Sequence, residues 1–119
     1  MRRVLLADGA AGGRELLRIL LEHEGYEVFE ASDGLEAVEK ALAILPDLIL
    51  LDLDLPAADG YAVMQKMRLD ERLKERAILA LTASPRNGDG ERLVNAGFSG
   101  YIAKPVMLRA LREQLARLA

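Results

Sequence analysis

The sequence contains no cysteine and no tryptophan, and it has a single histidine. Without cysteine the chain has no disulfide, no thiol nucleophile and no thiolate-ligated metal. The single histidine, His23, excludes a metal site built from several histidines, and we expect this residue to be solvated or to cap the end of a helix. A Ser-His-Asp triad has no support in this composition either.

Long apolar runs and an excess of basic residues are also absent. No run approaches the ~20 residues needed to span a bilayer, and Met1 to Val4 lead into a short strand-like run rather than a signal peptide. We therefore expect a cytoplasmic location and no membrane partner. The net charge of −3 and the pI of 5.2 argue against nucleic-acid binding, which usually needs a basic face.

The sequence is rich in aliphatic residues and has the length of one domain. At 119 residues, with 51% hydrophobic and 4% aromatic residues, it can bury a core of Leu, Ala, Ile and Val without covalent cross-links. We expect one domain over residues 1–119, with no room for a second functional domain.

Strand-like and helical patterns alternate along this domain. Strand-like runs begin near residues 4, 27, 48, 77 and 101. Leucine stripes predict the first and fifth helices, and Asp33 and Glu36 form a capping-box pattern at the start of the second. The expected limits are Gly25 after helix one, Pro46 after helix two, the turn 56–60 and the charged stretch 70–76 around helix three, Pro85 and Gly97 around helix four, and Pro105 before helix five.

The spacing of the strands predicts their order in a sheet. About 20 to 30 residues separate successive strands, enough for a helical crossover between parallel strands. The second run is flanked by Glu27 and Glu30 and is typical of an edge strand, whereas the third and fourth are purely aliphatic. We expect an α/β fold with a doubly wound, five-stranded parallel sheet in the flavodoxin-like order 2-1-3-4-5, with its ligand crevice between strands one and three.

Four of the strand-like runs stop on a polar residue: Asp8, Asp52, Thr82 and Lys104. Singly, each could be a turn-capping acid, a β-forming residue or a solvated charge. Together, at one edge of a parallel sheet, two carboxylates, a hydroxyl and an ammonium suit a hard cation and a transferable phosphoryl group, with one carboxylate as acceptor.

These residues and their neighbours resemble a known family. Asp52-Leu53-Asp54-Leu55-Pro56 with Asp59-Gly60, then Leu81-Thr82-Ala83, then Tyr101-Ile102-Ala103-Lys104-Pro105 are similar to the response-regulator receiver domain of two-component signalling, over essentially the whole chain. The resemblance implies a signalling switch rather than an enzyme, one that catalyses only its own phosphoryl transfer and dephosphorylation. Asp52 would accept a phosphoryl group from a phosphohistidine on a histidine kinase or a histidine phosphotransfer protein.

The resemblance also implies roles for the other residues. Asp8, Asp52 and the backbone carbonyl of Asp54 would bind Mg²⁺, the one cofactor expected. Lys104 would pair with a phosphoryl oxygen, and Thr82 would donate a hydrogen bond to the phosphorylated site while Tyr101 rotates inward. The output would be contact with an unknown downstream protein through the fourth helix, fifth strand and fifth helix, by a monomer or weak homodimer.

One family feature is missing, because Gly9 stands where the second acid of the first strand is usual. Magnesium binding should therefore be weaker than usual. Asp54, two residues after the acceptor, could aim a replacement carboxylate at the site, modulate phosphate lifetime together with Ser84, or be a solvated turn acid. The glycine-rich stretch 9–13 lacks the phosphate-loop spacing, and we expect a flexible connection there.

Two other functions are open at this point. Gly9 also suits a degenerate receiver that acts as an interaction module without phosphorylation. Asp52-Leu53-Asp54 resembles the nucleophile and acid of haloacid-dehalogenase-type phosphohydrolases, although that motif normally closes the first strand and no acidic pair follows Lys104. The receiver could stand alone or be part of a longer hybrid kinase or multidomain regulator.

Overall fold

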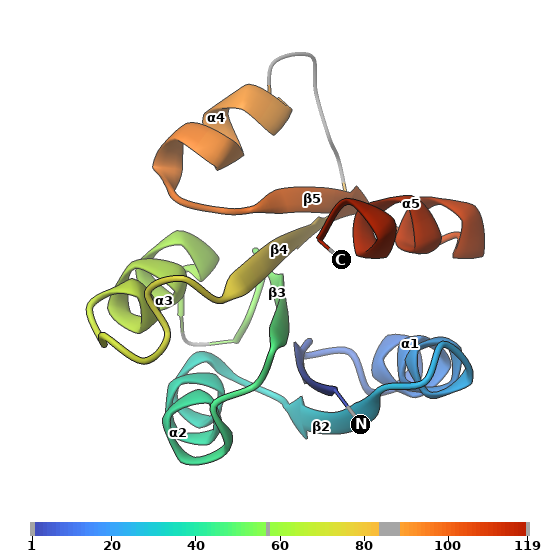
Figure 1. Ribbon diagram of the computed structural model, residues 1–119, viewed down its shortest axis with the longest axis horizontal. Coiled ribbons are helices and arrows are strands. Elements are labelled where there is room, and N and C mark those ends of the chain that lie inside the picture. The colour runs from blue at the N-terminus through green and yellow to red at the C-terminus, as the bar shows by residue number, and fades with distance from the viewer. Residues whose placement is uncertain (1, 57, 84–88, 119) are drawn as a thin grey trace.

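The computed structural model describes residues 2–56, 58–83 and 89–118. In these residues five strands alternate with five helices (Figure 1). The strands are β1 (Arg3–Ala7), β2 (Glu27–Ala31), β3 (Leu48–Asp52), β4 (Ala77–Thr82) and β5 (Gly100–Ala103). The helices are α1 (Ala11–His23), α2 (Gly34–Ile44), α3 (Gly60–Arg68), α4 (Asp89–Ala96) and α5 (Leu108–Leu118). The expected strand starts agree with these bounds to within one residue.

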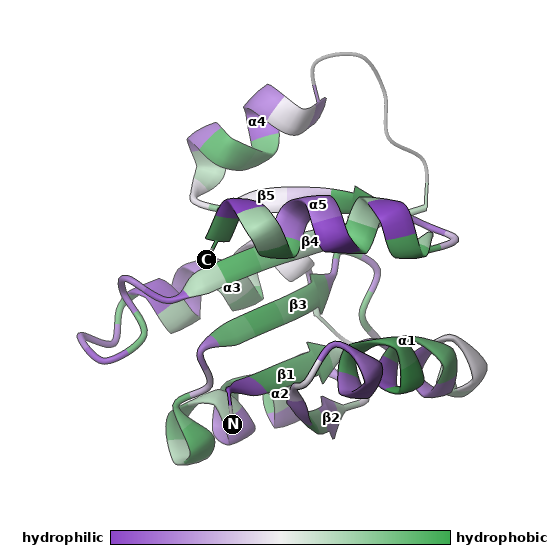
Figure 2. Cartoon of the chain, turned by 45° about the vertical axis from the view of Figure 1, so that its right-hand side comes forward, coloured by the Kyte–Doolittle hydropathy of each residue, from purple (hydrophilic) through white to green (hydrophobic). Residues whose placement is uncertain are grey.

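The strands form one parallel sheet in the order β2-β1-β3-β4-β5, which confirms the predicted fold. The arrowheads of β1, β3 and β5 consequently point to the same side of the molecule (Figure 2). β3 is buried along its whole length, whereas β2 is only partly buried, as expected for a central and an edge strand.

Helices cover both faces of the sheet. In Figure 1, α1 and α5 lie on one side, and α2, α3 and α4 lie on the other. Side chains alternate along each strand, so every strand contributes to two separate apolar clusters. Packed with α1 and α5 are Val4, Leu6, Leu48, Leu50, Leu79, Leu81 and Ile102. Packed with α2, α3 and α4 are Leu5, Ala7, Ile49, Leu51, Ile78 and Ala80.

The helix signals were predicted correctly at α2, with one difference in detail. The carboxylate of Asp33 accepts the N–H of Glu36, as an N-cap residue does. The carboxylate of Glu36, however, accepts the N–H of Ser32 instead of that of Asp33. The helix ends at Ile44, and its C-cap residue, Leu45, has a φ of 52° in the left-handed region directly before Pro46.

One expectation about a loop was wrong, because residues 11–13 are the first turn of α1 rather than a flexible connection. In the charged stretch 70–76 the charged side chains are exposed or partly exposed, while Leu73 is fully buried and Arg68 donates hydrogen bonds to the carbonyls of Leu73, Lys74 and Arg76. The predicted start of the fourth helix at Pro85 lies outside the described residues.

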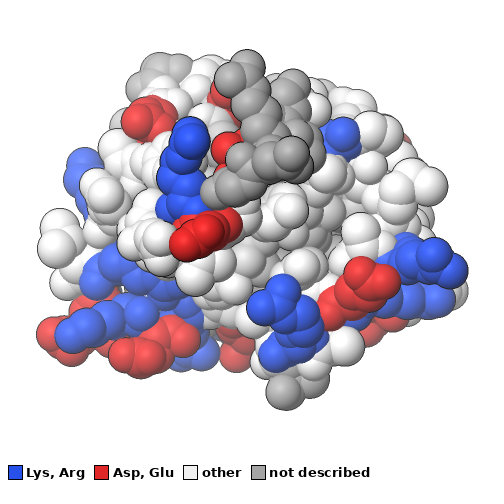
Figure 3. All heavy atoms as spheres, turned by 90° about the horizontal axis from the view of Figure 1, so that it is seen from above, with Lys and Arg blue, Asp and Glu red and all other residues white. Residues whose placement is uncertain are grey.

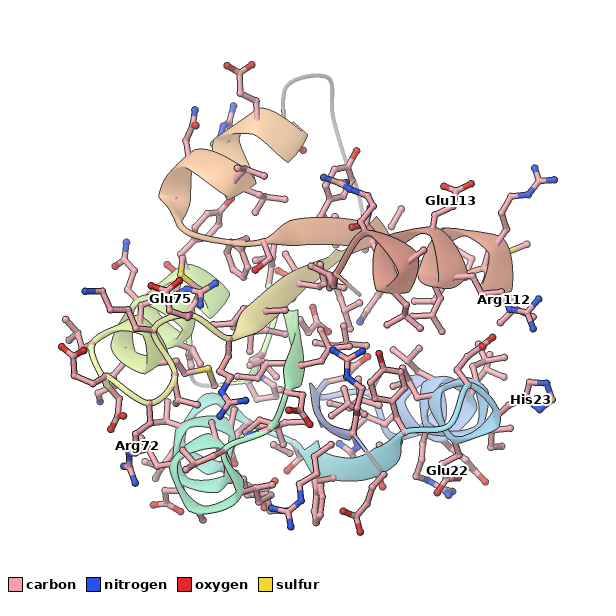
Figure 4. The ribbon with its side chains drawn as sticks, viewed as in Figure 1. Glu22, His23, Arg72, Glu75, Arg112 and Glu113 are labelled. Carbon is pink, nitrogen blue, oxygen red and sulfur yellow. The ribbon has the colours of Figure 1, made fainter. Side chains whose placement is uncertain are left out.

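Charges are distributed over the surface in both signs. On the face shown in Figure 3, basic and acidic side chains lie next to one another without a large area of a single sign. Arg112 extends from α5 to pair with Glu24 at the end of α1, and His23 is exposed at the same end, as expected (Figure 4). None of the helices in the described part of the chain is long and apolar enough to cross a membrane.

Candidate functional site

The register of the sheet brings the polar strand ends together. Ala7 lies opposite Leu51, so Asp8 and Asp52 follow on adjacent strands at the point where the sheet order reverses direction. Thr82 lies opposite Ala103, which places Lys104 one residue beyond β5 at the same edge. The structure therefore gathers all four predicted residues at the carboxyl edge.

Three of the four residues form one buried cluster. The Lys104 Nζ lies 2.5 Å from Oδ2 of Asp52 and 3.0 Å from Oδ2 of Asp8. Each carboxylate uses its other oxygen to accept a backbone N–H two residues ahead, from Ala10 and from Asp54, both at 2.9 Å. Both carboxylates are therefore held in fixed orientations by one backbone and one ammonium contact.

The cluster is short of positive charge. Asp8 and Asp52 are 2% and 6% exposed, and with Lys104 they give two negative charges against one positive. Burial alone would lower the pKa of Lys104, but the hydrogen bonds and charges of Asp52 and Asp8 outweigh burial and raise this pKa. Lys104 is therefore a firmly protonated cation, and the cluster favours one more cation.

Thr82 reaches the same edge without joining the cluster. Its backbone carbonyl accepts the N–H of Lys104 at 2.8 Å, but among the described residues its hydroxyl bonds to neither Asp52 nor Lys104. The reason is the alternation along β4, which points Thr82 to the face of Ile78 and Ala80. Asp52 instead continues the face of Leu50.

Tyr101 lies on the same face as Thr82. Its half-buried ring packs against the core of α2, α3 and α4, and it borders Gly90 in the first turn of α4. A Cβ atom on Gly90 would come within 2.7 Å of Tyr101 Cε1. The absence of a side chain at residue 90 therefore makes room for this ring.

The comparison with known proteins adds a family to this geometry. The chain matches the response regulator receiver domain over residues 4–116. It belongs to that family. Receiver domains are the phosphoacceptor switches of response regulators, and the comparisons give no support to the phosphohydrolase alternative.

Curated relatives include regulators of different lengths. The chain is 38% identical over 118 residues to the DNA-binding dual master transcriptional regulator RpaA of Synechocystis sp. (strain ATCC 27184 / PCC 6803 / Kazusa), covering 99% of this chain but only 48% of RpaA. It is 36% identical over 114 residues to the polar-differentiation response regulator DivK of Brucella ovis, covering 96% of this chain and 93% of DivK.

Solved structures share this fold, and one of them holds a metal ion. The chemotaxis response regulator CheY4 of Vibrio cholerae superimposes with a TM-score of 0.92 at 29% identity, over 100% of this chain and 99% of that one. The receiver domain of the sensor histidine kinase PA1611 from Pseudomonas aeruginosa PAO1 superimposes with a TM-score of 0.89 at 33% identity, over 98% of this chain and 96% of that one. That receiver was solved with a magnesium ion coordinated in its active site cleft.

The donor chemistry of this receiver fits Mg²⁺ incompletely. Two buried carboxylates are the hard oxygen ligands that Mg²⁺ takes from proteins, usually with water and phosphate oxygens completing the octahedron. The described residues contain no group of three or more His, Cys, Asp and Glu side chains that could hold a metal. The site therefore suits a cation completed by water and phosphate rather than a closed protein cage.

The carboxylate of Asp54, the candidate replacement for the missing acid, does not join the cluster of Asp8, Asp52 and Lys104. Asp54 is exposed, and within the described residues its carboxylate has no hydrogen bond or ion pair. Ser84, its proposed partner in setting phosphate lifetime, lies outside the described residues. At Gly9, a Cβ would approach Pro56 Cδ to 2.6 Å, so the space beside this backbone is filled by the loop after β3.

Two arginines that hold backbone carbonyls in place, Arg14 and Arg68, were not predicted from the sequence. Arg14 donates a hydrogen bond of 2.7 Å to the backbone carbonyl of Asp8. Arg68 joins the loop before β4 to the end of α4 through bonds to the carbonyl of Gly97 at 3.0 and 3.2 Å. The only signal in the sequence was an arginine near a helix end, Arg14 in the first turn of α1 and Arg68 at the last residue of α3, which composition alone does not distinguish from a solvated residue.

Proposed function

We propose that Asp52 is the phosphoacceptor of this receiver. The observation that supports it is the position of its carboxylate, buried at the end of β3 and bonded to Lys104 beside Asp8. A carboxylate attacking phosphorus needs the charge of the phosphoryl oxygens neutralised by fixed cations. Lys104 contacts both acids, but the contact with Asp52 is the shorter one, at 2.5 Å against 3.0 Å for Asp8, and an exposed residue, Asp54, lies next to Asp52 in the turn.

The reaction moves one phosphoryl group between two nucleophiles. An oxygen of Asp52 forms a bond to phosphorus while the bond from phosphorus to the donor histidine nitrogen breaks. The departing nitrogen keeps the electron pair and takes up a proton. In dephosphorylation a water oxygen forms a bond to phosphorus while the bond from phosphorus to the Asp52 oxygen breaks, inorganic phosphate and a proton leave, and the receiver returns to its free carboxylate.

Lys104 and a bound cation divide the work of charge neutralisation. Lys104 moves from the Asp52 carboxylate to a phosphoryl oxygen as the phosphoryl group arrives. Bound Mg²⁺ supplies Lewis-acid neutralisation of the phosphoryl oxygens. Asp8, Asp52 and the backbone carbonyl of Asp54 would hold it, more weakly than in receivers with two adjacent acids, because Gly9 contributes no ligand.

Thr82 and Tyr101 then carry the change to the other face of the sheet. Moving a conformational equilibrium from 1:99 to 99:1 takes about 5.5 kcal/mol of differential binding. One hydrogen bond to a charged group supplies about 1.5 to 3 kcal/mol, so Thr82 and Lys104 together supply about 3 to 6. Both contacts are needed for a complete switch, and Tyr101 follows Thr82 because they share one face.

The partners follow from this chemistry. The phosphodonor is a histidine kinase or a histidine phosphotransfer protein, and the output is contact with a downstream protein. A hollow of about 220 Å³ beside Asp8 and Lys104 is lined by apolar side chains of α1, where Leu16 is 58% exposed. That apolar rim supports the approach of a donor protein to the site. The cytoplasmic location and the monomeric or weakly dimeric state stay predictions.

Intact mass spectrometry tests the acceptor. Wild type is incubated with acetyl phosphate, with and without Mg²⁺, beside Asp52→Asn and the matched control Asp54→Asn. We expect one phosphoryl adduct in wild type and in Asp54→Asn, increased by Mg²⁺ and absent from Asp52→Asn. Labelling that survives in Asp52→Asn would disprove the assignment.

A receiver that works without phosphate is the second candidate, and Gly9 is the observation that favours it. It predicts no adduct and no change in amide chemical shifts on adding Mg²⁺. Failure of both acetyl phosphate and a phosphohistidine donor to label wild type would establish this alternative.

A further inference from the structure

The turn between β1 and α1 has little intrinsic reason to be ordered. The N-cap residue of α1, Ala10, has no side chain that could accept a backbone N–H, and the first turn carries no acidic residue. Gly12 and Gly13 follow, and glycine is the poorest helix former after proline. Yet this turn orients Asp8, whose Oδ1 accepts the N–H of Ala10.

Arg14 supplies the missing anchor. Its Nη1 donates to the carbonyl of Asp8 at 2.7 Å, and its Nε lies 3.4 Å from Oε1 of Glu30 on β2. The side chain is 19% exposed, so these contacts are made largely away from water. From the first turn of α1, the guanidinium is therefore joined to the end of β1 by a hydrogen bond and to the neighbouring edge strand by an ion pair alone, because its Nε makes no hydrogen bond within the described residues.

Arg18, one turn further along α1, shares with Arg14 the ion pair to Glu30 but not the hydrogen bond to Asp8. It also pairs with Glu30, at 3.6 Å, and with Glu22 at 3.2 Å, and it is 35% exposed. Among the described residues it has no bond to Asp8. The two arginines share an ionic partner, and they differ in the contact to the backbone of the site.

We propose that Arg14 is a positioning residue for Asp8. By holding the Asp8 carbonyl, it fixes the turn in which Ala10 orients the carboxylate, and so it sets the geometry of the one β1 carboxylate that this receiver has for a cation. The role matters more here than in a receiver with two adjacent acids, because Gly9 offers no second ligand to compensate. This inference rests on the proposed function in its use of Mg²⁺.

The experiment compares Arg14→Gln with Arg18→Gln. Both variants lose an ion pair to Glu30, but only the first loses the bond to Asp8. Two quantities are measured: hydrogen exchange of the Ala10 amide in the metal-free protein, and the Mg²⁺ dissociation constant from amide shifts. Global stability from urea unfolding is recorded for both.

We expect Arg14→Gln to speed exchange of the Ala10 amide by roughly tenfold or more, as the loss of a charged hydrogen bond allows. The Mg²⁺ dissociation constant should rise by about tenfold, which is the lower end of the loss in affinity seen when a residue that hydrogen-bonds a metal ligand is removed. Arg18→Gln should leave both within about twofold of wild type. Equal values in the two variants, for exchange and affinity, would overturn the proposal.

A rescue variant separates positioning from general stability. Gly12 has no atom within 4 Å of where a Cβ would be, so Gly12→Ala strengthens the first turn without a new contact. Added to Arg14→Gln, it should recover part of the Ala10 protection. If Arg14→Gln alone does not fold, both arginine variants are compared with Gly12→Ala present.

The test of Arg14 can be separated from the test of Asp52 as phosphoacceptor. Ala10 exchange is measured without metal and without phosphate, so it tests Arg14 even if Asp52 is never labelled. An unlabelled wild type with fast Ala10 exchange in Arg14→Gln would remove the acceptor assignment and leave the positioning role.

Discussion

The two faces of the sheet end differently at the carboxyl edge. On the face of α1 and α5, the alternation continues into Asp8, Asp52 and Lys104, which are bonded to one another. On the face of α2, α3 and α4 it continues into Thr82 and Tyr101, which are half-buried and whose side chains, within the described residues, have no bond to that cluster. The first face holds the charges in fixed positions by hydrogen bonds and ion pairs, and the second carries a hydroxyl and a ring that those bonds do not hold.

This difference bears on the proposed switch. In that proposal, phosphorylation changes the charge at Asp52, on the face where buried aliphatic side chains pack with α1 and α5. Thr82 would turn toward the new anion across the edge of the sheet, because Asp52 and Leu81 are paired and Thr82 is next along β4. The proposal therefore predicts that transmission depends on the Thr82 hydroxyl and the Tyr101 ring.

Removing the ammonium should have the largest effect. In Lys104→Ala two buried carboxylates lose their shared counter-ion, and we expect a loss of about 2 to 3 kcal/mol, below the usual range because Lys104 is 24% exposed. Urea unfolding beside Lys66→Ala, an exposed lysine, measures it. Added Mg²⁺ should restore part of the loss. A loss no larger than that of Lys66→Ala would contradict the prediction.

High pH should remove the same contribution in wild type. The pKa of Lys104 is raised in the folded state above its ordinary 10.5, so its stabilisation is full below about that pH and is lost as pH rises through the folded pKa. The effect should be smaller than that of the mutation, because a neutral amine still donates hydrogen bonds. The difference in unfolding free energy between wild type and Lys104→Ala should therefore narrow, without vanishing, as pH rises above 10.5. A constant difference would count against it.

Placing the second acid at residue 9, as Gly9→Asp, should lower the free energy of unfolding and strengthen Mg²⁺ binding. A Cβ at residue 9 meets Pro56 at 2.6 and 2.9 Å, and displacing this exposed ring should cost about 1 to 2 kcal/mol in both Gly9→Asp and Gly9→Ala. Only Gly9→Asp should bind Mg²⁺ more tightly than wild type. Isothermal titration with Mg²⁺ and urea unfolding check both parts. Equal affinity in the two variants would show that the acid does not reach the cation.

Two glycine-to-alanine changes test the contact between Gly90 and the ring of Tyr101, with Gly12 as the control. Gly12→Ala in α1 should stabilise the fold by about 1 kcal/mol, since nothing lies within 4 Å of the new methyl group. Gly90→Ala should gain less or nothing, because its methyl group displaces the ring of Tyr101. In a Tyr101→Ala background Gly90→Ala should recover its gain. Urea unfolding of the four variants tests this, and equal gains at both glycines would rule out the contact.

Thr82→Ala should have the smallest effect on the resting fold. With no hydroxyl bond to the site among the described residues, we expect a change within about 0.5 kcal/mol in the free energy of unfolding. The phosphorylated protein should nevertheless switch incompletely, as amide shifts of α4 and β5 would show, while Thr82→Ser switches fully. A full response from Thr82→Ala would refute the role of the hydroxyl.

Much of the fold and the site could be predicted from particular residues. Apolar runs ending on Asp8, Asp52, Thr82 and Lys104 indicated the strands and their shared edge, because parallel strands bring their carboxyl ends together. Contacts that depend on side-chain direction were not predictable. The split of Thr82 from Asp52, and the packing of Pro56 beside Gly9, depend on the register and the loop path.

The sequence by itself determined the order of the elements, the sheet and the chemical types at its edge, since hydrophobic period and turn residues are local properties of the chain. Only the tertiary structure decided which of those groups touch. It joined Lys104 to two acids from distant strands, turned Thr82 to the opposite face, and made Arg14 an anchor for Asp8. These outcomes depend on long-range packing, because a side chain finds its partner only after the strands and helices have fixed its direction.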